Sequence, residues 1–238
     1  MRGRVLVITG TGTEVGKTVV TAAVAARALA DGQRVAVLKP AQTGLPARAP
    51  GDAAETARLA GRLTVGELAR YPDPLAPATA AERSGLPPVT PAETAKAAEE
   101  LAEDHDLVLV EGAGGLLVRF DALGGTLADA ATLLAAPVLV VVEARLGTLN
   151  LTALTAEALR ARALPLAGLV IGRWPAAPDL AARCNLRDLP VVADAPLLGA
   201  VPDGAGALPP DTFQAASARW LAPALGGRLD PATLADSP

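Results

Sequence analysis

The residues best suited to chemistry form the tripeptide Gly16-Lys17-Thr18, which follows a short apolar run that ends in glycines. This pattern is typical of loops that bind the phosphates of a nucleoside triphosphate. Successive backbone N–H groups and the positive end of the following helix attract the phosphates. We expect Lys17 to reach the β- and γ-phosphates and Thr18 to bind Mg²⁺. By chance the tripeptide occurs in about one chain in forty of this composition, so the sequence predicts a triphosphate site.

The spacing of the glycines departs from the strict phosphate-binding loop. The strict form has a glycine five residues before Gly16, where this chain has Thr11, with Gly10 and Gly12 on either side. We interpret the segment as a loop that is one residue longer. A glycine-rich helix entry without a ligand is the alternative, and the apolar strand before the loop and the helix after it make that alternative the weaker one.

Two further charged residues follow apolar runs, Lys39 after residues 34–38 and Glu111 after residues 107–110. Ligands bind beyond the carboxyl ends of the strands in an open parallel sheet, so we expect both side chains beside the glycine loop. Lys39 could neutralise charge on a transferring phosphoryl group, and Glu111 could be the acidic Mg²⁺ partner of Thr18. Each could also be a solvated charge at a strand end. Asp52 fits either a metal ligand or a helix N-cap that pairs with Glu55.

These side chains need a scaffold in which strands and helices alternate. The apolar patterns predict strands at residues 5–9, 34–38, 107–110, 138–142 and 166–171, with short strands near Val191 and at 198–201. They predict helices at residues 18–30, 52–61, 91–103, 126–135, 149–163, 179–185 and 211–221. Residues 71–91 contain six prolines and are expected to form a long surface loop. We therefore expect an α/β fold with a single doubly wound, mostly parallel sheet of the P-loop NTPase type over residues 1–225, and a loosely ordered tail over residues 226–238.

Composition excludes several other classes of protein. The net charge is −4 without a run of like charges, which gives little support for a nucleic-acid partner or an anionic membrane. A single cysteine, Cys184, and a single histidine, His105, exclude an internal disulfide and a Cys/His zinc cluster. The most apolar run, residues 133–142, is too short to span a bilayer and is interrupted by Pro137. No secretory signal is visible, and we expect a soluble cytoplasmic protein.

The set GTGTEVGKT, Lys39-Pro40 with Thr43-Gly44, Gly51-Asp52, VEGAGG and LGTLN resembles the dethiobiotin synthetase family over about residues 1–225, in order. The resemblance implies an ATP- and Mg²⁺-dependent reaction of 7,8-diaminononanoate with CO₂ or bicarbonate, which gives dethiobiotin, ADP and phosphate in biotin biosynthesis. It also implies a carbamate and then a carbamic–phosphoric anhydride. Such a reaction needs no enzyme nucleophile, so catalysis would consist of positioning and charge stabilisation.

The same resemblance implies a role for individual residues. The catalytic residues would be Lys39 and Lys17, and the Mg²⁺ ligands Thr18, Asp52 and Glu111. The nucleotide would contact Glu14, Val15, Gly16, Lys17, Thr18, Val19, Asp52, Glu111, Gly112, Ala113, Gly114, Gly172, Arg173, Val201, Pro202 and Asp203. The substrate would contact Thr11, Thr43, Gly147, Thr148, Leu149 and Asn150. In the family the turn equivalent to residues 147–150 comes from the other subunit, which implies a homodimer with its substrate site at the interface.

One position departs from the family pattern. Many relatives have an Asn-Asp pair where this chain has Gly172-Arg173, and the family uses that Asn to read the adenine ring. Glycine has no side chain with which to make these hydrogen bonds, so we hypothesise relaxed discrimination between ATP and other triphosphates. Trp174 would either stack on the base or pack within the fold.

Two other functions compete with dethiobiotin synthesis as interpretations of the sequence. A nucleotide-switched dimeric ATPase of the partition or positioning type shares the P-loop, but such proteins usually have a basic surface or an amphipathic tail, and the C-terminal GGRLDPATLADSP is neither. An amidating synthase of cobalamin biosynthesis would need an added glutaminase domain with a cysteine nucleophile.

Overall fold

Seven strands form one parallel sheet in the order β3-β2-β4-β1-β5-β6-β7. The computed structural model describes residues 3–230 and Thr233. The strands are β1 (Arg4–Gly10), β2 (Val35–Thr43), β3 (Thr64–Tyr71), β4 (Leu107–Gly115), β5 (Val138–Val142), β6 (Leu166–Trp174) and β7 (Leu197–Pro202). The predicted doubly wound α/β fold is confirmed.

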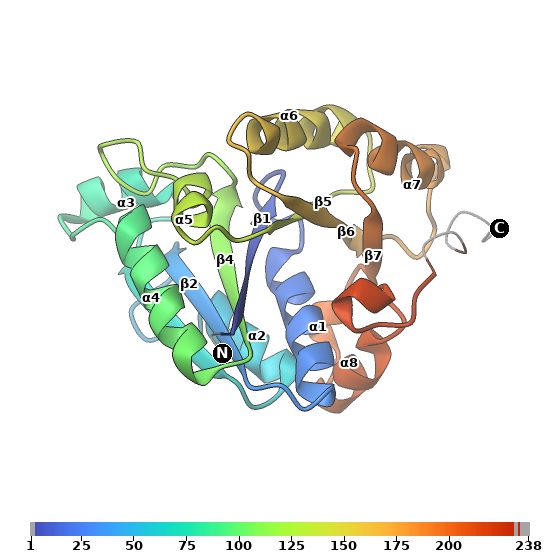
Figure 1. Ribbon diagram of the computed structural model, residues 1–238, viewed down its shortest axis with the longest axis horizontal. Helices are drawn as coiled ribbons and strands as arrows, with labels where there is room; N and C mark the ends of the chain where they lie inside the picture. Colours follow the sequence, from blue (N-terminus) through green and yellow to red (C-terminus); the bar gives the residue numbers. More distant parts are fainter. Residues whose placement is uncertain (1–2, 231–232, 234–238) are drawn as a thin grey trace.

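Helices cover both faces of this sheet (Figure 1). They are α1 (Lys17–Ala30), α2 (Asp52–Ala60), α3 (Pro77–Ser84), α4 (Pro91–Asp104), α5 (Leu127–Leu133), α6 (Thr148–Arg160), α7 (Leu180–Ala193) and α8 (Pro210–Ser217), with 3₁₀ turns at Ala205–Ala207 and Pro223–Leu225. Helices α1, α2 and α8 contribute to the apolar cluster on one face, and α3 to α7 to the cluster on the other. The core therefore lies in two layers, as expected for a sheet whose strands are buried on both faces.

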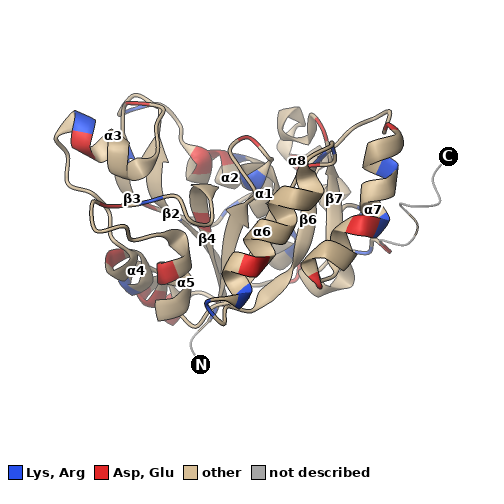
Figure 2. Cartoon of the chain, turned by 90° about the horizontal axis from the view of Figure 1, so that it is seen from above, with Lys and Arg blue, Asp and Glu red and all other residues tan. Residues whose placement is uncertain are grey.

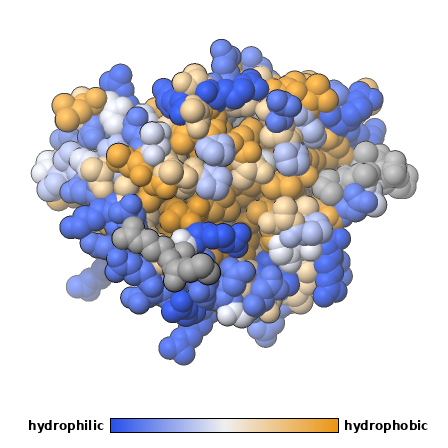
Figure 3. Space-filling model, in the orientation of Figure 1, coloured by the Kyte–Doolittle hydropathy of each residue, from blue (hydrophilic) through white to orange (hydrophobic). Residues whose placement is uncertain are grey.

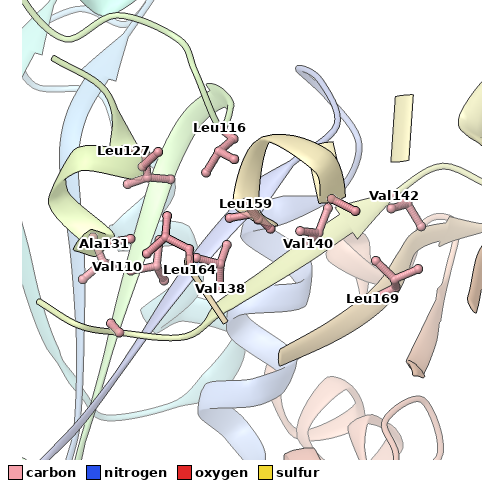
Figure 4. Packing of buried hydrophobic residues seen from close by; sticks show 14 of the residues in the cluster. Val110, Leu116, Leu127, Ala131, Val138, Val140, Val142, Leu159, Leu164 and Leu169 are labelled. Atoms are coloured by element: carbon pink, nitrogen blue, oxygen red, sulfur yellow. The ribbon is translucent and has the colours of Figure 1, made fainter. Parts of the chain in front are cut away.

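Small aliphatic side chains build the layer under α5 and α6. Leu127 of α5 and Leu159 of α6 point toward Val110 of β4 and Val138 and Val140 of β5 (Figure 4). All five side chains are at most 1% exposed. Such complete burial of valine and leucine supplies most of the free energy that holds the helices on the sheet, at about 1.5–3 kcal/mol per side chain.

Local signals in the sequence explain where two of these helices begin. Thr90 precedes α4 and Thr126 precedes α5, and each threonine oxygen accepts a hydrogen bond from the backbone N–H three residues later. The side chains of Glu93 and Asp129 return a hydrogen bond to the threonine N–H. These reciprocal bonds satisfy N–H groups that have no partner inside the helix.

Three predicted features of the C-terminal half and the proline-rich segment are wrong. The segment 71–91 contains helix α3, because Pro77 occupies the first turn, where a missing N–H costs nothing. No strand forms near Val191, since α7 continues to Ala193 with Pro190 inside it. The last predicted helix ends at Ser217 instead of residue 221, because Leu221 forms a bridge with Gly199 of β7.

One strand of the sheet was not predicted from the sequence, and the loose order expected over residues 226–238 stays a prediction. Strand β3 lies at the edge of the sheet, and half of its residues are exposed and only Tyr71 is buried, so it lacks an apolar pattern. In the predicted tail, the N–H groups of Arg228 and Leu229 donate to the carbonyls of Ala218 and Leu221. Residues 231–232 and 234–238 of the tail lie outside the described residues.

The topology creates a crevice beside β1. Strand β1 lies between β4 and β5, and the chain fills the β4 side of the sheet before it crosses to the β5 side. Side chains and loops at the carboxyl ends of β1 and its neighbours surround the point where the order reverses. Open parallel sheets bind ligands at such points. None of the helices in the described part of the chain has the length and apolar character that a membrane crossing requires.

Candidate functional site

A cavity of about 930 Å³ lies at the carboxyl ends of the strands. Its walls come from the glycine loop, the ends of β2, β4, β6 and β7, and the proline-rich segment 74–77. Of the residues predicted for the site, those that line it are Glu14, Gly16, Lys17, Thr18, Val19, Lys39, Thr43, Asp52, Ala113, Gly114, Gly172, Arg173, Pro202 and Asp203. Residues from six separate stretches of the sequence are thus brought around one space large enough for a nucleotide and a small second substrate.

The glycine loop has the backbone shape expected of an anion-binding turn. Glu14 has φ 61° and Gly16 has φ 96°, so two residues of the loop adopt the left-handed region just before α1. Left-handed residues in such a turn aim successive N–H groups into one concavity. Gly16 also needs its lack of a side chain, because a Cβ there would lie 2.4 Å from the carbonyl oxygen of Gly172.

Lys17 is buried at the start of α1, and its Nζ donates to the carbonyl oxygen of Gly12 at 2.9 Å. Burial, together with the positive charge of Lys39, lowers the pKa of Lys17 from 10.5 to about 8, against the opposing effect of Glu111 and Asp52. The ammonium group is therefore costly in this environment, and a bound polyanion would stabilise it.

Glu111 is the centre of a buried hydrogen-bonded cluster. Its Oε1 accepts from Thr18 Oγ1 at 2.9 Å and from Lys39 Nζ at 2.9 Å, and its Oε2 accepts from Thr21 Oγ1 at 2.7 Å. The side chain is only 1% exposed. Glu111 itself does not line the cavity; it lies behind Thr18 and Lys39, which do. The prediction that Lys39 and Glu111 lie beside the glycine loop is confirmed.

Lys39 connects the two carboxylates of the site. Its Nζ lies 2.5 Å from Asp52 Oδ2 and 2.9 Å from Glu111 Oε1, and it donates to the carbonyl of Gly112 at 3.1 Å. Burial lowers the pKa of Lys39, but the charges of Glu111 and Asp52 outweigh burial and hold that pKa above its usual value. Lys39 is therefore a fixed positive charge at the cavity wall.

Asp52 does not act as the helix N-cap that the sequence allowed. The cap of α2 is Gly51, which has no side chain, and Glu55 pairs with Arg58 instead of reaching back. The N–H of Asp52 donates to Gln42 Oε1 at 2.8 Å. Because a side chain from β2 replaces the local cap, the carboxylate of Asp52 is available to Lys39. Because both carboxylates pair with Lys39, three oxygen-bearing side chains lie close together, those of Thr18, Asp52 and Glu111. The described residues contain no group of three or more His, Cys, Asp or Glu arranged to hold a metal ion.

Sequence reasoning missed Gln42 and Thr21. Gln42 is buried, lines the cavity and caps α2, but its amide matches no short motif. Thr21 lies one turn after Thr18, and spacing along a helix could have placed it on the same side. The segment 74–77 forms part of the wall and was missed because it was predicted as a surface loop.

Gly172 lies against the glycine loop. A Cβ at Gly172 would lie 2.1 Å from the carbonyl oxygen of Val15 and 2.6 Å from a methyl group of Val141. The end of β6 therefore approaches the loop too closely for any larger residue in this backbone arrangement. Next to it, Arg173 Nε donates to Asp203 Oδ1 at 3.0 Å, and this pair forms part of the cavity wall.

The remaining predicted residues lie off the cavity wall within one chain: Thr11, Val15, Gly112, Gly147, Thr148, Leu149, Asn150 and Val201. Their roles stay predictions. Trp174 packs against the apolar cluster to which α3 to α7 contribute and does not line the cavity, which favours the packing role. His105 at the end of α4 contacts Thr64 Oγ1 and the carbonyl of Leu101, and Cys184 is a free thiol on α7.

Comparisons with known proteins agree with this geometry. A family profile described as an AAA domain matches residues 4–207. The chain is 70% identical over 226 residues to the ATP-dependent dethiobiotin synthetase BioD of Streptomyces coelicolor, covering 95% of each chain. It is 68% identical over 233 residues to the protein of the same name from Streptomyces avermitilis, covering 98% of each chain.

Among solved structures, the cell division ATPase MinD of Pyrococcus furiosus matches with a TM-score of 0.58 at 18% identity, over 90% of this chain and 97% of that chain. At that identity the likeness shows the P-loop NTPase fold alone. High identity over nearly the whole length of the curated relatives is what identifies the family. The chain belongs to the ATP-dependent dethiobiotin synthetase family.

Proposed function

We propose that this protein converts 7,8-diaminononanoate, CO₂ and ATP into dethiobiotin, ADP and phosphate. The observation that carries the proposal is the position of Lys39, which lines the same cavity as the glycine loop while it contacts Glu111 and Asp52. A fixed positive charge beside the phosphate-binding loop suits stabilisation of a phosphoryl group in transfer. The names of the relatives support the product.

The proposed reaction has three steps. A neutral amine of the substrate adds to CO₂ and loses a proton to give a carbamate. A carbamate oxygen attacks the γ-phosphorus of ATP, and ADP leaves. The second amine, also neutral, attacks the carbonyl carbon of the resulting carbamic–phosphoric anhydride and loses a proton, and phosphate leaves as the ring closes. Lys39 and Lys17 balance the negative charge that spreads over the transferring oxygens, and the loop holds the reactants in line.

We propose that Mg²⁺ binds with the nucleotide at Thr18, Asp52 and Glu111. A hydroxyl and two carboxylates are the hard oxygen ligands that Mg²⁺ prefers, and it usually takes few protein ligands beside phosphate oxygens and water. When bound, Mg²⁺ would neutralise charge on the β- and γ-phosphates. The convergence of both carboxylates on Lys39 Nζ supports the set, since it places their oxygens close together.

We further propose a homodimer in which residues 147–150 complete the partner's substrate site. Those residues do not line the cavity of their own chain. Leu146 is 79% exposed, and Leu151 and Leu154 are 41% and 55% exposed. In Figure 2, α6 carries charged residues only toward its C-terminal end, where Glu157 and Arg160 lie. Leu151 and Leu154 are exposed on an uncharged stretch of α6, and Leu146 is exposed just before it. Exposed leucines grouped in this way are typical of a protein–protein interface.

The activity is tested with purified protein, the diamine, bicarbonate, Mg²⁺ and ATP, following dethiobiotin by mass spectrometry and phosphate release in parallel. We expect dethiobiotin that depends on the diamine and is lost in Lys39→Ala. Lys96→Ala is the matched control, because Lys96 is 78% exposed on α4 and, among the described residues, pairs only with Glu100 at 3.8 Å. Phosphate release that is indifferent to the diamine, without a cyclic urea, would instead indicate a nucleotide-switched P-loop ATPase.

The shared site is tested by mixing two inactive variants, Lys39→Ala and Asn150→Ala. In a mixed dimer one of the two sites contains both native residues if residues 147–150 act across the interface. Random mixing should then restore about a quarter of the native activity. No recovery, with dimers that exchange subunits freely, would place Asn150 and Lys39 in the same chain's site.

A further inference from the structure

The side chain of Thr21 is fully buried between α1 and β4. It lies one helical turn after Thr18, and both hydroxyls point toward the carboxylate of Glu111. Thr21 Oγ1 is 2.7 Å from Glu111 Oε2 and 2.9 Å from the carbonyl oxygen of Lys17. A hydroxyl has one proton, and the ionised carboxylate is the stronger acceptor of the two. Thr21 therefore donates to Glu111.

The two oxygens of Glu111 have different partners. Oε1 accepts from Thr18 and Lys39, and both of these residues line the cavity. Oε2 accepts from Thr21, which does not line the cavity. In the proposed function, which this inference takes as its basis, Thr18 also binds Mg²⁺ and Lys39 also contacts the transferring phosphoryl group. The bond from Thr21 is the one that the reaction leaves undisturbed.

We propose that Thr21 is a positioning residue that holds Glu111 by Oε2 and so keeps Oε1 directed at the metal and the phosphates. Without this bond, Glu111 Oε2 would lack a partner in a buried environment. The carboxylate would then rotate toward other donors. Hydrogen bonds from behind a metal ligand commonly set its orientation and affinity. Thr21 thus acts through Glu111 and never touches the substrate.

The structure offers a matched pair for the test. Thr21→Val removes the hydroxyl with almost no change in shape, and Thr21→Ser keeps the hydroxyl while it removes a methyl group. Thr56→Val is the control, because Thr56 is also fully buried and its Oγ1 has no hydrogen-bond partner among the described residues. Thr21→Ala provides a second variant without the hydroxyl if Thr21→Val fails to fold.

The first readout is ADP affinity by calorimetry with and without Mg²⁺, supported by Mn²⁺ binding followed by electron paramagnetic resonance. We expect Thr21→Val to weaken metal binding about tenfold and to leave metal-free ADP affinity unchanged. Thr21→Ser and Thr56→Val should bind the metal like the native protein. In turnover, Thr21→Val should raise the Mg²⁺ concentration that gives half-maximal rate by a similar factor.

Two results would overturn the proposal. Native metal affinity in Thr21→Val or Thr21→Ala would show that Glu111 is positioned without this hydroxyl. An equal loss of metal-free and metal-dependent ADP affinity in Thr21→Val and Thr21→Ser would show that Thr21 only packs α1. The titrations contain no diamine, so a failure to form dethiobiotin would count against the proposed function and leave this test intact.

Discussion

Lys39 Nζ and Glu111 Oε1 lie 2.9 Å apart, and the two side chains are 3% and 1% exposed. Removing one partner of a buried ion pair leaves an uncompensated charge away from water. We predict that Lys39→Met lowers the free energy of unfolding by about 3–5 kcal/mol, measured by urea denaturation. Lys39→Met/Glu111→Gln should be less destabilised than Lys39→Met alone. A double variant whose loss equals or exceeds the sum of the single losses would contradict this pairing.

The lowered pKa of Lys17 predicts a proton uptake when nucleotide binds. Bound phosphates oppose the effect of burial and raise the pKa from about 8, so at about pH 8.5 binding should take up about three quarters of a proton. Calorimetry in buffers of different ionisation enthalpy measures this number. Lys17→Arg should show none of this uptake, since arginine stays charged. Equal uptake in Lys17→Arg would assign the proton to another group.

The same pKa has a consequence for stability. Between pH 8 and 10.5 the unfolded chain holds more protons on Lys17 than the folded protein does. The contribution of Lys17 to the free energy of unfolding of the ligand-free protein should therefore increase as the pH rises through this window, which makes the folded protein more stable. That contribution should be absent from Lys17→Met, which has no titratable group at this position.

Gly172 should tolerate no side chain. A Cβ there would lie 2.1 Å from the backbone oxygen of Val15, so we predict that Gly172→Ala destabilises the protein by about 1–3 kcal/mol and weakens nucleotide binding by displacing the loop. Gly12→Ala is the control for stability, because its Cβ would meet its nearest atom at 3.8 Å. Thermal unfolding measures the stability of both variants. If Gly172→Ala is as stable as the native protein, the end of β6 can shift to make room for the added methyl group.

The absence of an amide at position 172 bears on the choice of nucleotide. Discrimination between ligands is strong where a site makes hydrogen bonds that only one of them satisfies. Without such a side chain at Gly172, we predict dethiobiotin formation with ATP, CTP and GTP at rates within about tenfold of one another. The measurement is the steady-state rate with each triphosphate at saturating diamine. A strong preference for ATP would refute the hypothesis.

Gln42 should couple the start of α2 to Lys39 through Asp52. We predict that Gln42→Met destabilises the protein by about 1 kcal/mol through the lost cap and raises the KM for nucleotide by displacing Asp52. Gly51→Ala should have the same effect, because its Cβ would lie 2.7 Å from Gln42 Oε1. Gln33→Met is the control, since Gln33 Oε1 has no hydrogen-bond partner within the described residues. If Gln42→Met and Gly51→Ala change the KM for nucleotide differently, the capping of α2 by Gln42 does not control the position of Asp52.

The surface of the face shown in Figure 1 carries hydrophobic side chains in its middle and hydrophilic ones around its rim (Figure 3). Leu154 lies on α6, at the edge of this view, and is 55% exposed, so Leu154→Glu should weaken the proposed dimer without unfolding the chain. Sedimentation velocity measures the change. An unaltered dimer would mean that α6 lies outside the interface.

The sequence alone determined the features that depend on local or neighbouring residues. Continuous apolar runs predicted β1, β4, β5 and β6, because a strand buried on both faces needs no other pattern. The glycine loop and Lys17-Thr18 predicted a phosphate site, since the loop and the helix start are consecutive in the chain. Lys39 and Glu111 were predicted at the same edge because the carboxyl ends of parallel strands lie together, and in the structure the two side chains form an ion pair.

Only the tertiary structure decided the contacts made across the fold. The exposed edge strand β3 is formed by pairing with β2, and its own residues have little apolar pattern. Asp52 is released from a capping role because Gln42, ten residues earlier on another element, takes that role. Thr21 meets Glu111 across 90 residues of sequence, and Gly172 meets Val15 at a distance that no local pattern records. Such contacts depend on how layers of the fold pack together, and packing is a property of the whole chain.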